Sequence, residues 1–119
     1  MPRHPIAVKR AYDPPADSDG LRVLVDRLWP RGLARSEARL DLWLKEVAPS
    51  PALRRWFGHD PARWPEFVRR YREELQRNPT AAARLQALAA EGPVTLVYAA
   101  RDRDHNQAIA LQAYLAERD

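Results

Sequence analysis

Two short apolar segments, residues 22–28 around Val23-Leu24-Val25 and residues 94–99, constrain the fold of this 119-residue chain more than any other feature. Apolar residues occupy consecutive positions in both, which is typical of strands that are covered on both faces, as in a parallel sheet. A long passage with helical patterning separates the two segments, and such crossovers return to the same sheet as parallel neighbours. We therefore predict an α/β fold: a small Rossmann-like domain with a mainly parallel three-stranded sheet, a long helical crossover and a C-terminal helix.

The remaining elements follow from helix and turn signals. Residues 6–10 have the pattern of a short first strand, which ends in a loop over 13–20 rich in Pro, Asp and Gly. The orientation of this strand stays open, since its loop is also short enough for a hairpin. Ser36, Ser50-Pro51, Asp60-Pro61 and Asn78-Pro79 are typical helix starts, and they predict helices over 36–47, 51–57, 61–77 and 79–91. A last helix is expected over 105–117.

Length and composition exclude several classes of site. A chain of 119 residues is expected to form one domain, spanning 1–119, without a metal or disulfide staple. The absence of Cys excludes thiolate metal sites and cysteine nucleophiles and suits a reducing compartment. The 3 His form no close ligand pair, and the 4 Gly form no phosphate-binding loop, so we expect no metal and no cofactor. Without a signal peptide or an apolar span, the expected location is cytoplasmic, with no membrane partner.

The basic charge is spread along the chain. There are 18 Arg and 2 Lys against 16 acidic residues, a formal net charge of +4. The densest basic run, Arg69-Arg70 with Arg72, is followed directly by Glu73 and Glu74. Such a mixed-sign pattern favours a solvated helix face over a nucleic-acid surface, although a nucleic-acid partner stays open.

Polar residues follow both apolar strands and form the candidate site. Asp26-Arg27 ends one strand, and Arg101-Asp102 follows the other. If the strands are parallel, these pairs meet at the carboxyl edge of the sheet, where open α/β sheets bind ligands. Arg31, His105 and Asn106 are expected near the same edge, the last two at the start of the last helix. Guanidinium groups and a helix N-terminus favour a small anion as ligand.

Two further residues have competing interpretations. His59 lies in a tight loop between two helices, where a lone His more often bonds the backbone than serves a site. Trp29 follows the second strand and is either a core residue or part of the pocket wall. Ion pairing at the strand ends and capping by Asp102 are the structural alternatives for the carboxylates.

Several long motifs resemble the YeaO-like family, the domain-of-unknown-function 488 group of bacterial proteins. They are Lys9-Arg10-Ala11-Tyr12-Asp13, the run from Arg22 to Gly32, the runs 43–50 and 53–59, and Thr95 to Asp102 with His105-Asn106-Gln107-Ala108. The resemblance covers nearly the whole chain and implies no established activity. Its polar motif residues are Lys9, Arg10, Tyr12, Asp13, Asp26, Arg27, Trp29, Arg31, Lys45, Arg54, His59, Asp102 and Asn106.

These observations lead to one main hypothesis with two alternatives. The chain binds or acts on a small anion, with a phosphate, carboxylate or nucleotide-like group, at the carboxyl edge of the sheet. Asp26, Asp102 and His105 are the candidates for acid–base chemistry. The alternatives are a nucleic-acid-binding module and a non-catalytic interaction protein; whether the chain is an enzyme, and its oligomeric state, stay open. The candidate ligand-binding residues are Lys9, Arg10, Tyr12, Arg27, Trp29, Arg31, His59, Arg101 and Asn106.

Overall fold

A four-stranded, entirely parallel sheet forms the centre of the fold in a computed structural model that describes residues 4–117. Its strands are β1 (Ile6–Arg10), β2 (Leu21–Leu24), β3 (Leu42–Trp43) and β4 (Val94–Tyr98), in the order β1-β4-β2-β3. The α/β class and the parallel pairing of β2 with β4 are confirmed. The orientation of β1 is settled as parallel, with Val8 opposite Leu96.

The prediction of three strands and of a helix over 36–47 was wrong. That region contains a short helix α1 (Arg35–Ala38), the strand β3 and a 3-10 turn, Lys45–Val47. Arg39 ends α1 in the left-handed conformation, with φ 47°, and the next residues pair with β2 through Leu44 N–H to Leu24 O at 2.9 Å. The apolar spacing of Leu40, Trp43 and Leu44 therefore reflects tertiary pairing, which overrode the helical periodicity.

The other helices lie close to their predicted positions. They are α2 (Pro51–Phe57), α3 (Trp64–Arg77), α4 (Pro79–Glu91) and α5 (Gln107–Glu117). Ser50 Oγ caps α2 by accepting from Leu53 N–H at 3.1 Å, as the Ser-Pro signal predicts. The predicted start at Asp60-Pro61 opens a 3-10 turn, Pro61–Arg63, which leads into α3. The last helix begins at Gln107, two residues later than predicted, because Asn106 serves as its cap.

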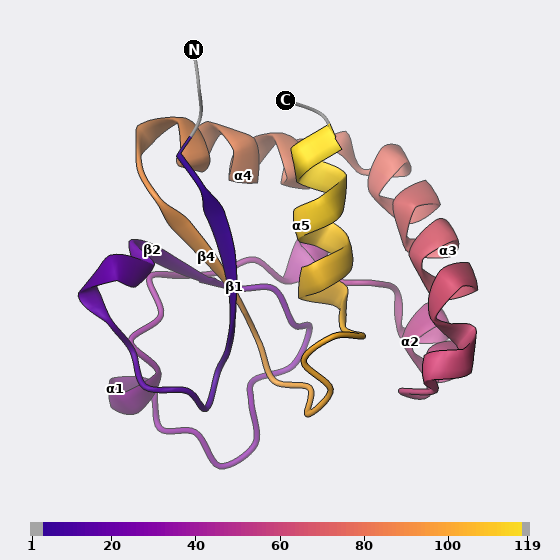
Figure 1. Cartoon of the computed structure of the whole chain (residues 1–119), viewed down its shortest axis with the longest axis horizontal. Coiled ribbons are helices and arrows are strands. Elements are labelled where there is room, and N and C mark those ends of the chain that lie inside the picture. The colour runs from indigo at the N-terminus through magenta and orange to yellow at the C-terminus, as the bar shows by residue number, and fades with distance from the viewer. Residues whose placement is uncertain (1–3, 118–119) are drawn as a thin grey trace.

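Both faces of the sheet are covered, but by different material. Val23 and Leu96 face the larger core, which Phe67, Tyr71 and Leu111 share from the helices α3 and α5. Leu24 and Val97, the alternate residues, face a smaller cluster with Ala11. Trp29, Leu33, Leu40 and Trp43 complete that second face. Figure 1 shows the same asymmetry, with α1 alone at the lower left, apart from the four longer helices.

The strands end together at one edge, which positions the candidate site. Because β1, β4 and β2 are parallel neighbours, their carboxyl ends lie at the same edge of the sheet, and β1 and β4 can be seen to run downward to it in Figure 1. The loops over 11–20, 25–34 and 99–106 leave the sheet from this edge. No helix within residues 4–117 is long and apolar enough to cross a membrane.

Candidate functional site

A pocket with a volume of about 550 Å³ opens at the carboxyl edge, between the ends of β2 and β4 and the helices α2 and α5. Six of its eight lining residues have polar or charged side chains, and the other two are alanines. This is the position at which parallel sheets of this class bind ligands. The lining residues are Asp26, Arg54, His59, Ala99, Ala100, Arg101, Asp102 and Gln107.

Asp26 is a half-buried carboxylate without a close cationic partner among the described residues. Its Oδ2 accepts from Ala99 N–H at 2.9 Å, and its Oδ1 accepts from Gln107 Nε2. Burial raises the pKa of Asp26 to about 6, against the opposing effects of the Ala99 hydrogen bond, the Arg54 charge and the Gln107 amide. The carboxyl group therefore changes charge close to neutral pH.

Asp102 organises the turn that leads into α5. Its Oδ1 accepts from the N–H groups of Asp104 and His105, at 2.9 and 3.1 Å, and its Oδ2 lies 2.9 Å from His105 Nδ1. The hydrogen bonds from the Asp104 backbone and the His105 ring hold the pKa of Asp102 below its usual range. Asp102 therefore stays ionised while it fixes the orientation of the His105 ring.

His105 and Asn106 lie behind the pocket rather than in its lining. The His105 ring packs edge-on against Trp64, with ring centroids 5.3 Å apart. Asn106 is buried; its Nδ2 donates to Asp102 O at 3.0 Å and its Oδ1 caps α5 by accepting from Ile109 N–H at 3.1 Å. Both Asn106 and Asp102 therefore bond to backbone N–H groups at or just before the start of α5, which is the capping role given above as the structural alternative for Asp102.

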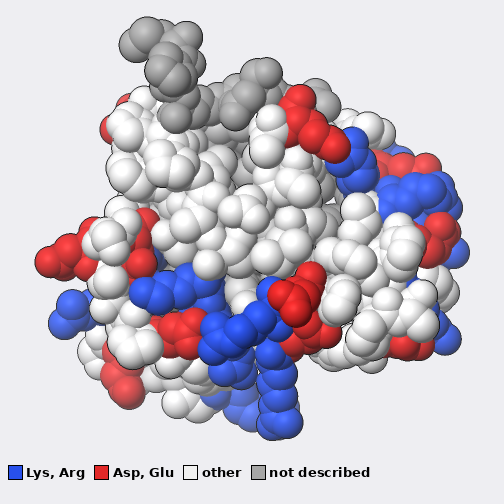
Figure 2. All heavy atoms as spheres, in the orientation of Figure 1, with Lys and Arg blue, Asp and Glu red and all other residues white. Residues whose placement is uncertain are grey.

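Two pocket arginines differ from most of the basic residues nearby. Within residues 4–117, the side chains of Arg54 and Arg101 form no hydrogen bond and no ion pair, and both are exposed. By contrast, Arg103 forms a bidentate pair with Asp13, at 2.8 and 2.9 Å. Along the lower edge of Figure 2, Lys and Arg atoms gather beside acidic ones, over the loops that follow the strands.

His59 lies at the rim of the pocket on a constrained backbone. Gly58 and His59 both have positive φ, 54° and 56°, and Gly58 ends α2 in the left-handed conformation. This region is uncommon for a residue other than Gly, although His is among the residue types enriched in it. The turn holds the exposed imidazole between α2 and α3, where it lines the pocket.

A second hollow, of about 230 Å³, adjoins the first. Arg54, His59 and Gln107 line both, so the two hollows meet at these three side chains. The rest of the second wall is mostly apolar rings. Its other lining residues are Pro49, Pro51, Arg55, Phe57 and Phe67. We call the 550 Å³ hollow the polar lobe and the 230 Å³ hollow the ring lobe.

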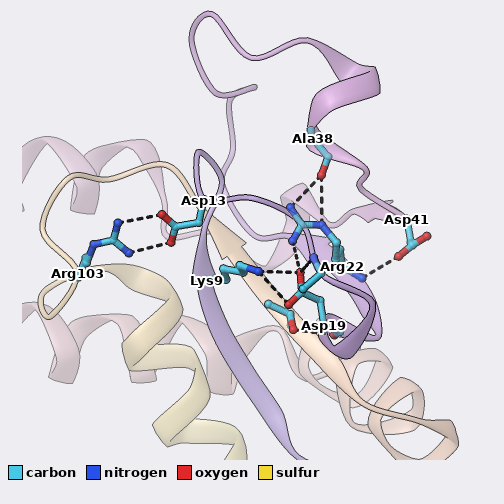
Figure 3. A network of polar contacts seen from close by, with 9 residues as sticks. Lys9, Asp13, Asp19, Arg22, Ala38, Asp41 and Arg103 are labelled. Carbon is cyan, nitrogen blue, oxygen red and sulfur yellow. Dashed lines mark hydrogen bonds and ion pairs between the residues drawn. The ribbon is translucent and has the colours of Figure 1, made fainter.

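The first-strand candidates lie outside both lobes. Lys9 Nζ lies 3.1 Å from both carboxylate oxygens of Asp19, in a network with Arg22 that Figure 3 shows. Arg10 donates from Nε to Ala100 O at 2.9 Å, which supports the polar lobe from behind. Tyr12 donates its hydroxyl to Arg31 O at 2.7 Å.

The candidates of the second-strand loop are also placed elsewhere. Arg27 points under α2 and donates from Nη2 to Ala48 O and Pro49 O, at 3.4 and 3.3 Å. Trp29 packs edge-on against Trp43 in the smaller core cluster, which is the core interpretation of that residue. The Arg31 side chain is exposed and outside the lining of both lobes. Of the predicted set, the structure therefore brings Asp26, His59, Arg101 and Asp102 into one pocket.

Sequence reasoning left Arg54 and Gln107 out of the site. Arg54 was one of the motif residues, but its place on a short amphipathic helix gave no reason to point it at the strand ends. Gln107 follows directly after Asn106, so its position at the start of a helix beside the sheet edge was the signal that could have placed it in the site. Within the described residues, no group of three or more His, Cys, Asp or Glu side chains is placed to hold a metal ion.

Comparison with known proteins identifies the family. Residues 5–118 match the family model described as "Inactive DUF488-N3 subclade". The chain is 41% identical over 110 residues to the uncharacterised protein YeaO of Escherichia coli K12, covering 92% of this chain and 96% of that protein. It is 42% identical over 110 residues to an uncharacterised protein of Mycobacterium tuberculosis H37Rv, covering 92% of each. No solved structure matches the chain. The motifs, the matched length and these identities show that the chain belongs to the YeaO-like DUF488 family.

Proposed function

We propose that this chain binds a small anion in the polar lobe, and that it does so reversibly rather than as an enzyme. The observation that carries the proposal is the pair of exposed guanidinium groups, Arg54 and Arg101, which line one pocket and form no ion pair or side-chain hydrogen bond within residues 4–117, although the carboxylates of Asp26 and Asp102 line the same pocket. Guanidinium groups bind carboxylate and phosphate oxygens through charge-assisted, often bidentate, hydrogen bonds. The site lies where parallel sheets bind ligands.

Three features favour binding over turnover. The lining of the polar lobe contains no Ser, Thr, Tyr, Lys or Cys, which leaves Asp26, His59 and Asp102 as the side chains that could act as nucleophiles. Asp102, a candidate acid or base, uses its carboxylate oxygens to hold the turn and the His105 ring. The family model that matches the chain is itself described as an inactive subclade. Asp26, Asp102 and His105 accordingly act as positioning groups in this proposal.

The nucleic-acid alternative has less support, because the basic helix is largely neutralised. On α3, Arg69 pairs with Glu66 and Glu73, at 2.6 and 3.2 Å, and Arg70 pairs with Glu66 at 2.8 Å. These exposed pairs spread positive and negative charge over the same face. A phosphate backbone is bound by clustered, unpaired basic groups.

The direct test is a titration of the 15N-labelled protein with inorganic phosphate, sulfate and acetate at constant ionic strength. We expect saturable shifts of the Ala99, Ala100 and Gln107 amides. Arg54→Met and Arg101→Met should each weaken phosphate binding by about tenfold, since one charge-assisted hydrogen bond is lost.

Arg84→Met is the matched control, because Arg84 is an exposed residue of α4, at the opposite edge of the sheet (Figure 1). It should bind phosphate as the parent protein does. Absence of saturable shifts with all three anions, or equal affinity in the Arg54→Met, Arg101→Met and Arg84→Met variants, would refute the proposal.

A further inference from the structure

The ring lobe is lined largely by apolar rings, which a site for a simple inorganic anion would not need. Phe57 and Phe67 are stacked on each other, with centroids 4.4 Å apart and 24° between their planes. They are core residues, 5% and 2% exposed, so a small part of each ring lines the lobe, and Pro49 and Pro51 add two more apolar rings. A lining of this kind favours an apolar, planar group.

The charged side chains that line the ring lobe are positive. Arg54 and Arg55 line it, and no Asp or Glu does. Neither guanidinium forms an ion pair or a side-chain hydrogen bond within the described part of the chain. Guanidinium groups stack on aromatic faces as well as binding anions, so both arginines suit an aromatic ligand that carries negative charge.

The ring lobe is large enough for an aromatic group. An apolar protein cavity of about 150 Å³ is known to hold one benzene molecule. The ring lobe, at about 230 Å³, is larger than that cavity and so has room for an aromatic ring. The polar lobe, at about 550 Å³, leaves ample space for an anionic group and a linker.

From these observations we infer that the ligand is an organic anion with an aromatic ring: the ring occupies the ring lobe, and the anionic group reaches Arg54 and Arg101 in the polar lobe. Arg54 belongs to both lobes and so faces the bond between ring and anion. This inference rests on the proposed function and names the class of ligand for that same site. An aryl acid and a pyrimidine nucleotide share this chemistry.

Four phosphates of increasing size test the inference by calorimetry with the full-length protein: inorganic phosphate, methyl phosphate, phenyl phosphate and 1-naphthyl phosphate. Phenyl phosphate should bind at least about tenfold more tightly than methyl phosphate, because the ring is removed from water. 1-Naphthyl phosphate should also bind more tightly than methyl phosphate, because its aromatic group is likewise removed from water. Benzoate and uridine monophosphate, run in parallel, distinguish the two sources of this chemistry, and tight binding of either supports the inference.

Variants of the lobe separate ring recognition from anion recognition. Phe57→Leu and Pro51→Ala should remove most of the advantage of phenyl over methyl phosphate and leave the affinity for inorganic phosphate unchanged. Pro51 is exposed at the first position of α2, where Ala is well tolerated, so this variant tests the inference even if Phe57→Leu unfolds. Pro61→Ala, the same substitution at the start of the next helical turn and outside both lobes, is the control.

The possible failures are distinguishable. Equal affinities for methyl and phenyl phosphate would overturn the inference and leave anion binding intact. Absence of binding by all four phosphates would instead overturn the proposed function.

Discussion

Two buried or half-buried aspartates, Asp19 and Asp26, lie in the same small domain and have opposite electrostatic surroundings. Asp19 accepts from Lys9 Nζ at 3.1 Å, from Arg22 Nη1 at 2.6 Å and from Ala16 N–H at 3.0 Å (Figure 3). Asp26 accepts only from neutral donors, Ala99 N–H and the Gln107 amide, within the described residues. The first carboxylate is surrounded by cations, and the second faces a pocket.

The pKa values follow this difference. Burial opposes the ionisation of Asp19, but the hydrogen bonds from Ala16, Lys9 and Arg22 outweigh it, and the pKa of Asp19 lies below its usual range. Burial dominates at Asp26 and raises its pKa to about 6. Full pairing therefore keeps the pKa of a buried carboxylate low, whereas incomplete pairing beside a pocket leaves the pKa raised, which is common at functional sites.

The largest expected effect comes from breaking the Asp19 network. Asp19→Ala leaves the Arg22 guanidinium, only 4% exposed, with Ala38 O as its remaining partner. We expect a loss of about 3–5 kcal/mol in the free energy of unfolding at pH 7, because a buried charge loses its counter-ion. Since the pKa of Asp19 is lowered by folding, its contribution is present above the unfolded pKa of about 3.9 and is lost as the pH falls through the lower folded value.

Urea unfolding at pH 7 measures this loss. Asp17→Ala is the matched control, because Asp17 is an exposed residue of the same 3-10 turn. A loss of unfolding free energy for Asp19→Ala no larger than that for Asp17→Ala would show that Asp19 is not a structural carboxylate.

A smaller effect of opposite sign is expected at Asp26. Its folded pKa is raised, so the folded state binds the proton more tightly than the unfolded state and loses stability as the pH rises from about 4 to 6. Asp26→Asn should remove that loss and stabilise the protein by up to about 3 kcal/mol at pH 8, since each pKa unit corresponds to about 1.4 kcal/mol. The asparagine keeps an acceptor for Ala99 N–H.

Urea unfolding of parent and variant at pH 4, 6 and 8 provides the measurement. Asp104→Asn, at an exposed position of the same edge, should show no such gain. If Asp26→Asn destabilises the protein equally at all three pH values, Asp26 is a structural carboxylate like Asp19.

The smallest expected effect sharpens the role of Arg54. Its positive charge lowers the pKa of Asp26 and partly offsets burial. Arg54→Met should therefore raise the pKa of Asp26 further, by up to about one unit, in a 13C NMR titration of the carboxyl carbon. Arg55→Met, the neighbouring exposed arginine, should change it less. Equal shifts in both variants would show that Arg54 has no special relation to the carboxylate.

The sheet edge could be predicted from the sequence because local signals and global topology agree there. Two apolar strands separated by a long, mostly helical passage are expected to pair as parallel neighbours. Parallel strands end at the same edge of the sheet, which brings Asp26 and Asp102 together. The helix starts at Ser50-Pro51 and Asn78-Pro79 could be predicted equally well, because the ring of Pro fixes φ at a value that suits the first helical position.

The direction in which a side chain points was harder to predict from the sequence than the course of the backbone. Lys9, Arg27 and Trp29 lie near the strand ends in sequence, but each is committed to a structural contact: with Asp19, with carbonyl groups before α2, and with Trp43. Pairing of β3 with β2 decided the region 39–44 against its helical spacing, because strand pairing depends on a partner far along the chain.

The α/β class, the family and the two carboxylates at the edge of the sheet could be predicted from the sequence, since periodicity, capping and motifs are local properties. Three other features follow from tertiary packing: the lack of ion pairs at Arg54 and Arg101 within residues 4–117, the position of Gln107 against Asp26, and the ring-lined lobe that adjoins the polar one. These properties depend on how α2 and α5 dock against the end of the sheet. Docking arises from packing between residues far apart in the sequence, and no local pattern records it.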